Sequence, residues 1–187
     1  KEIIYWPILH KDEGYWFSAF TKHSALIRIV DELKQNKMPL KIMWDAELPI
    51  KPSLIFKQIL NYFRNRKIIL DFFGNSRQYN IEILTSEYPF QSKFLRNLLF
   101  QLFLISFEQK LYKNKKIAML YTSLLKNHPN VEHFLENQIA IGKKSLGNDF
   151  LVALGLIDQG VDSNQPILKP EELDRDLRIV ILKSLSN

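Results

Sequence analysis

Five apolar runs rich in β-forming residues alternate with segments of helical character along this chain, and this alternation is the strongest constraint on its fold. The runs cover residues 3–9, 40–46, 80–86, 116–121 and 150–157, and the helical segments begin near residues 24, 52, 91, 128 and 169. Strands that alternate with helices favour a parallel sheet covered by helices. We therefore expect one α/β domain that spans residues 1–187.

The segment 67–73 fits either a buried strand or a continuation of the preceding helix. A strand there would leave only a few residues before the run at 80–86. A crossover between parallel strands needs about a dozen residues or more. The spacing therefore predicts that 67–73 is helical.

Composition excludes several classes of function. The chain of 187 residues has no cysteine, which excludes disulfides, thiolate metal sites and cysteine nucleophiles. Its net charge of +6 comes from cations spread along the sequence, so we expect no nucleic-acid partner. No glycine-rich phosphate motif is present, and we expect no cofactor. The most apolar stretch, Phe94 to Phe107, is too short and too polar to span a bilayer.

Two carboxylates end the second apolar run. Asp45 and Glu47 follow Leu40–Trp44, and Pro49 stops the run. Successive side chains of a strand point to opposite faces, so the two acids share one face and Trp44 packs on the other. Active sites of α/β proteins are built at the carboxyl ends of parallel strands. Two acids at such an end indicate acid–base chemistry or a divalent-metal site.

Other candidate residues lie in or just after the expected strands. Glu87 follows the third run, in the same topological place as Asp45, and completes a set of three candidate catalytic acids. Aromatic rings stack on sugar faces, although buried aromatics are more often core residues. The candidate substrate-binding residues are Trp6, His10, Tyr15, Trp16 and Tyr121. His10 lacks a second histidine at ligand spacing, so a histidine metal site is not expected.

This pattern resembles the (β/α) TIM barrels of glycoside hydrolases. The pieces that carry the resemblance are Tyr5-Trp6-Pro7, Gly14-Tyr-Trp16, Trp44-Asp-Ala-Glu47, Ser86-Glu-Tyr-Pro89 and residues 170–177. Chitinase-like and lysozyme-like barrel families carry an Asp-x-Glu at a strand end. The chitinase-type run of acids before the final Glu is absent here. A complete barrel needs at least about 200 residues, so we expect an incomplete or reduced barrel, or an open doubly wound sheet.

The resemblance implies a glycoside-hydrolase-like protein that acts on a polysaccharide or glycan through Asp45 and Glu47, with Glu87 assisting. The alternative is a non-catalytic barrel that binds a glycan or a protein partner through Tyr15 and Trp16. A divalent-metal enzyme on the same carboxylates is a third hypothesis. The sequence leaves the oligomeric state open, and it leaves both a secreted and a cytoplasmic location open.

Overall fold

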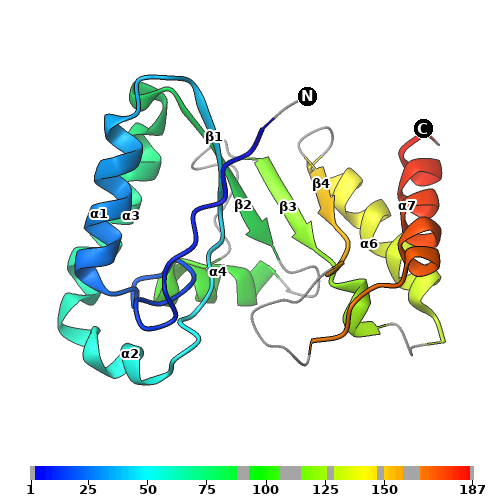
Figure 1. Cartoon of the computed structure of the whole chain (residues 1–187), viewed down its shortest axis with the longest axis horizontal. Coiled ribbons are helices and arrows are strands. Elements are labelled where there is room, and N and C mark those ends of the chain that lie inside the picture. The colour runs from blue at the N-terminus through cyan, green and yellow to red at the C-terminus, as the bar shows by residue number, and fades with distance from the viewer. Residues whose placement is uncertain are drawn as a thin grey trace. The chain divides into compact units, whose positions relative to one another are not determined.

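The computed structural model describes residues 3–87, 93–105, 115–125, 129–146, 150–157 and 165–185 (Figure 1). The chain divides into two compact units. Unit 1 comprises residues 1–86 and 91–115, and unit 2 comprises residues 87–90 and 116–187. The expectation of one domain over 1–187 stays a prediction, and each unit is described by itself.

Unit 1 is a parallel strand pair packed against helices. Strands β1 (Leu40–Trp44) and β2 (Ile81–Glu87) run parallel, with Leu40 opposite Ile81 and Trp44 opposite Thr85. The helices of the unit are α1 (His23–Gln35), α2 (Ser53–Lys57), α3 (Tyr62–Asn75) and α4 (Lys93–Phe103), with short 3-10 turns η1 (Ile59–Asn61) and η2 (Ser76–Tyr79). Helices α1 and α3 lie side by side (Figure 1).

Unit 2 repeats this arrangement with fewer elements. Strands β3 (Lys115–Met119) and β4 (Phe150–Ala153) pair in parallel, and helices α6 (Val131–Leu146) and α7 (Pro170–Leu185) pack on each other. The 3-10 turn η3 (Thr122–Leu125) follows β3. Gly142 of α6 lies directly against the Phe150 ring, so any side chain at position 142 would overlap that ring. Glycine therefore allows α6 to approach β4 this closely.

The expectation of a TIM-barrel-like domain is wrong. The described residues contain four strands and six α-helices, whereas a complete barrel has eight of each and about 250 residues. The broader α/β class with parallel strands is confirmed by the pairings of β1 with β2 and of β3 with β4. Among the described residues, no helix is long and apolar enough to cross a membrane.

The predicted first strand is also shorter than expected. Only Tyr5 pairs with β1, through its N–H to the Lys41 carbonyl and its carbonyl to the Met43 N–H, both at 2.8 Å. The next donor on that side of the segment would come from residue 7. Pro7 has no N–H, so the ladder stops after a single bridge.

The remaining elements match the sequence predictions with shifted ends. The helical prediction for 67–73 is confirmed, because the segment lies within α3. The helix expected to begin near residue 91 is described as α4, and residues 106–114 lie outside the described ranges. Strand β4 is shorter than the expected run at 150–157.

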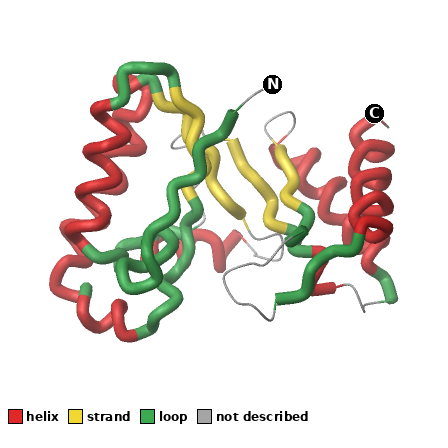
Figure 2. The backbone as a smooth tube through the Cα atoms, viewed as in Figure 1, coloured by secondary structure: helices red, strands yellow, loops and turns green. Residues whose placement is uncertain are grey.

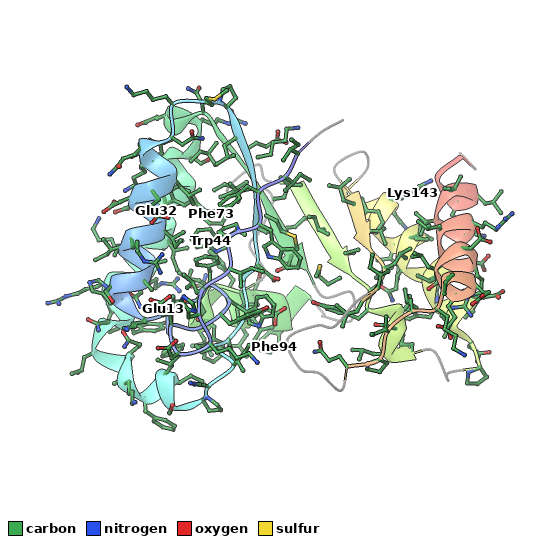
Figure 3. The ribbon with its side chains drawn as sticks, in the orientation of Figure 1. Glu13, Glu32, Trp44, Phe73, Phe94 and Lys143 are labelled. Atoms are coloured by element: carbon green, nitrogen blue, oxygen red, sulfur yellow. The ribbon has the colours of Figure 1, made fainter. Side chains whose placement is uncertain are left out.

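The core of unit 1 is built on one face of β1. Ile42 and Trp44 are fully buried there among apolar residues of α1 and α3, and the Trp44 ring stacks on Phe17 at 4.2 Å between centroids. Figure 3 shows Trp44 beside Phe73, whose ring meets it edge-on at 5.5 Å. This confirms that Trp44 packs beneath the helices, so the alternate face of β1 carries Met43 and Asp45.

Trp44 should dominate the stability of unit 1. Replacing it with Ala empties a fully buried site and should lower the free energy of unfolding by about 3–5 kcal/mol. Trp44→Phe should cost much less, because it keeps the aromatic contacts and removes a buried indole N–H that has no acceptor among the described residues. Urea unfolding followed by the fluorescence of Trp6 and Trp16, which lie in the same unit, measures both.

The matched control for these variants is Met38→Ala, at a side chain that is 72% exposed. It should change the free energy of unfolding by no more than about 0.5 kcal/mol. A Trp44→Ala variant as stable as this control would contradict the packing described for β1.

Candidate functional site

The candidate site lies where strands β1 and β2 end in unit 1. The strand register pairs Trp44 with Thr85, so Asp45 follows opposite Ser86. The Ser86 hydroxyl oxygen accepts a hydrogen bond from the Ala46 N–H at 3.1 Å, which ties the two strand ends together. Both residues come after the last ladder pair, at the carboxyl edge where α/β proteins place their ligands.

The Asp45 side chain is buried, and the Ser86 hydroxyl is the group that stabilises its charged form. It is 0% exposed, and neither carboxylate oxygen forms a hydrogen bond of ordinary geometry within the described part of the chain. Burial raises the pKa of Asp45 from 3.8 to about 6, and the nearby Ser86 hydroxyl offsets part of that rise. A carboxyl group with such a pKa holds its proton well above the pH at which an exposed aspartic acid loses it.

A loop of residues 8–22, which precedes α1 in the sequence, lies against Asp45. The Phe17 N–H donates to the Asp45 carbonyl at 3.0 Å, and the Phe17 ring stacks on Trp44. Figure 2 shows this loop, in green, at the same end of unit 1 as the carboxyl end of β1. The loop turns at Gly14 and Tyr15, which both have positive φ angles, of 133° and 65°. Tyr15 is held in a conformation that residues other than glycine rarely adopt.

Buried polar side chains fix the rest of the loop. The Thr21 hydroxyl donates to the Trp16 carbonyl at 3.1 Å and accepts from the Ser18 N–H at 2.9 Å. From α3, the side-chain amide of Asn65 donates to the carbonyls of Ala19 and Thr21 at 3.0 and 2.7 Å. Asn65 is fully buried, so these bonds are sheltered from water. The loop that covers Asp45 is therefore a built part of unit 1.

Two of the predicted substrate-binding residues lie in this loop. Tyr15 and Trp16 are half-buried, and their rings meet edge-to-face at 4.3 Å. Trp16 directly precedes Phe17, which contacts Asp45 through the backbone. His10 is exposed and begins the same turn, with its carbonyl accepting from the Glu13 N–H at 2.9 Å. The structure therefore places three predicted site residues in the loop that covers the predicted acid.

The other predicted residues are spread over unit 1 and unit 2. Glu47 is half-buried two residues further along the chain. Glu87 ends β2, and its side chain lies outside the described part of the chain. Trp6 is 42% exposed in the segment that follows the Tyr5 bridge. Tyr121 belongs to unit 2, where it has a positive φ of 45°.

Ser86 and Phe17 are site residues that sequence reasoning missed. A parallel pairing of the expected strands 40–46 and 80–86 places Ser86 within one residue of the observed position opposite Asp45. Phe17 carries no comparable signal, because its role depends on how an irregular loop returns to β1. Its backbone bond to Asp45 is visible only in the folded chain.

This arrangement suits proton transfer better than metal binding. A buried carboxyl group with a pKa near 6 can donate a proton at mildly acidic pH and accept one above it. Within the described ranges, no group of three or more His, Cys, Asp or Glu side chains is placed to hold a metal ion. A pocket of about 300 Å³ lies at the other end of β1, between Tyr5, Leu33 and Leu40, and Asp45 does not line it.

The sequence matches no family model, and no curated protein or solved structure is significantly similar to it. Interpretation of the site therefore depends on the geometry of unit 1.

The buried Asp45 should make unit 1 less stable as pH rises. The folded-state pKa of Asp45, about 6, is above the unfolded value of 3.8, so the folded state binds its proton more tightly between these values. The free energy of unfolding should fall across that window and level off above pH 6. About two pKa units correspond to about 3 kcal/mol.

Asp45→Asn should remove this loss. At pH 7 the variant should be more stable than the natural chain by up to about 3 kcal/mol, and the two should converge near pH 3. Urea unfolding at several pH values, followed by tryptophan fluorescence, measures the difference. Asp31→Asn, at an exposed position of α1, is the matched control and should change stability by no more than about 0.5 kcal/mol. A destabilised Asp45→Asn at pH 7 would contradict this description.

Proposed function

We propose that unit 1 carries an acid–base site in which Asp45 is the proton donor, and that its substrate is a glycan whose glycosidic bond it hydrolyses. The observation that carries the proposal is the fully buried Asp45 carboxyl group at the carboxyl end of β1. Holding a carboxylate in the interior costs stability. Strongly perturbed acids in such places cluster at functional sites.

In the proposed reaction, the Asp45 carboxyl group gives its proton to the glycosidic oxygen as the bond to the anomeric carbon breaks. A water molecule adds to that carbon and gives a proton to the Glu47 carboxylate. Proton return from Glu47 to Asp45 through solvent completes the cycle. Burial raises the pKa of Asp45, which suits the acid role. Half-buried Glu47 lies closer to solvent, which suits the base role.

The aromatic pair supports a glycan as the substrate class. Tyr15 and Trp16 are both half-buried, so part of each side chain remains open to a ligand. Aromatic rings can stack on the apolar face of a sugar, and these two precede Phe17, whose N–H donates to the Asp45 carbonyl. Asp45 is 0% exposed, so the proposed reaction requires a local opening that brings its carboxyl group to the substrate.

A non-catalytic glycan-binding protein is the second candidate. The observation that favours it is the same burial: a carboxyl group that is 0% exposed contacts no ligand without a local opening. In that case Tyr15 and Trp16 bind the glycan, and Asp45 only shapes the loop. The Asp45→Asn variant separates the two candidates. It should lower turnover if Asp45 is the proton donor, and it should leave glycan binding intact if the protein only binds the glycan.

The catalytic proposal predicts both a pH profile and a variant effect. Release of reducing ends from a mixture of short oligosaccharides should fall as pH rises through about 6, because Asp45 then loses the proton that it donates. Asp45→Asn should lower the rate by about 100-fold or more. Asp31→Asn is the control and should keep the natural rate.

Since Asp45→Asn is expected to be more stable at neutral pH, a loss of rate in this variant cannot be attributed to unfolding. Glycan binding without hydrolysis, abolished by Tyr15→Ala and Trp16→Ala but unchanged by Asp45→Asn, would establish the second candidate instead. Hydrolysis at an unchanged rate in Asp45→Asn would refute the role given to this residue.

A further inference from the structure

A cluster of large apolar side chains is open to water where α2 leads into α3. Within eight residues, Phe56 is 77% exposed, Ile59 60%, Leu60 88% and Phe63 78%. Single exposed apolar residues are ordinary on protein surfaces, but a contiguous group of this kind marks a place of interaction. Figure 1 shows α2, in cyan, at the outer lower edge of unit 1. We call these four residues the α2–α3 apolar turn.

The turn is held in place from its inner side, so its exposure is not the result of a loose segment. Leu54 is buried beneath it. The Gln58 side-chain oxygen accepts from the His23 N–H at 3.2 Å and from the Asn61 amide at 3.1 Å. The Tyr62 hydroxyl donates to the Leu102 carbonyl of α4 at 2.6 Å. Leu54 and the hydrogen-bonding side chains of Gln58 and Tyr62 thus hold the turn to the protein, and Phe56, Leu60 and Phe63 are exposed to water.

The charged side chains of the turn's own segment have one sign. Residues 51–67 contain five cationic side chains and no acidic one. Arg66 donates to the carbonyls of Phe100 and Gln101, and Lys67 pairs with Asp71. The other three, Lys51, Lys57 and Arg64, are exposed and form no ion pair within the described ranges. These exposed cations flank the apolar side chains along the chain and attract an anionic partner.

The geometry points to the surface of an anionic lipid bilayer as the partner of the α2–α3 apolar turn. Phe and Leu side chains that project from a short helix insert between lipid headgroups, and adjacent Lys and Arg side chains bind lipid phosphates. The long cationic side chains can reach the headgroup level while the aromatic rings lie deeper. The inference is independent of the site at Asp45, because neither the residues nor the chemistry are shared.

Vesicle flotation of the whole chain tests this inference. Vesicles of phosphatidylcholine with about 30% phosphatidylglycerol should carry the protein upward, and vesicles of phosphatidylcholine alone should not. Raising the salt concentration should weaken binding, because it screens the lipid charge. The triple variant Phe56→Ser/Leu60→Ser/Phe63→Ser should lower the partition coefficient by at least about tenfold.

Two matched controls separate this surface from general effects of charge and apolarity. Met38→Ser/Ile157→Ser/Leu182→Ser removes three comparably exposed apolar side chains elsewhere and should bind as the natural chain does. Lys57→Glu/Arg64→Glu should abolish binding to the anionic vesicles. Lys37→Glu/Lys144→Glu makes the same change in net charge at exposed positions outside residues 51–67 and should weaken binding far less.

Circular dichroism should show that all variants remain folded, because every substituted side chain is exposed. Three outcomes would overturn the inference: no flotation with either vesicle, equal binding to neutral and anionic vesicles, or an unchanged partition coefficient in the Phe56→Ser/Leu60→Ser/Phe63→Ser variant. A dimer of the natural chain that this variant dissociates, without vesicle binding, would assign the turn to a second copy of the chain instead.

Discussion

The parallel pairing of β1 with β2 is the constraint on which the rest of unit 1 depends. Its register sends Ile42 and Trp44 into the apolar core formed with α1 and α3, and it leaves Met43 and Asp45 on the opposite face. A shift of one residue would place the Asp45 carboxylate among the rings that surround Trp44. Phe17 stacks on Trp44, and its N–H donates to the Asp45 carbonyl. These two contacts hold the loop of residues 8–22 against the carboxyl end of β1.

The same register makes the charged form of the Asp45 side chain destabilising. A buried carboxylate that the Ser86 hydroxyl stabilises only in part is less stable than the same group in water, and burial raises its pKa so that the proton is retained up to about pH 6. An amide would occupy nearly the same volume without that cost. The natural residue thus lowers stability at neutral pH at the proposed site, a cost that is common where function requires a destabilising group.

Local features of the site were predictable from sequence, and long-range ones were not. The apolar run followed by Asp45 was sufficient to place the acid at a strand end and Trp44 on the opposite face, because strand alternation is a local rule. The prediction of a TIM-barrel-like fold was wrong, because an alternating strand and helix pattern defines the repeated unit but not the number of strands that assemble. Pro7 limited the first expected strand to one bridge, because proline has no backbone N–H to donate. A prediction based on the pattern of apolar side chains does not include this effect. Ser86 and Phe17 required the register and the return of a loop, which depend on tertiary contacts.

The most direct test of this account is a carbon-13 NMR titration of the Asp45 side-chain carboxyl group, assigned by its absence in Asp45→Asn. The account predicts a single titration with a midpoint at about pH 6, because burial disfavours the charged form by more than the Ser86 hydroxyl stabilises it. A midpoint at or below the ordinary aspartic-acid value of 3.8 would show that the carboxylate is solvated or paired, and would contradict the site proposed at the end of β1.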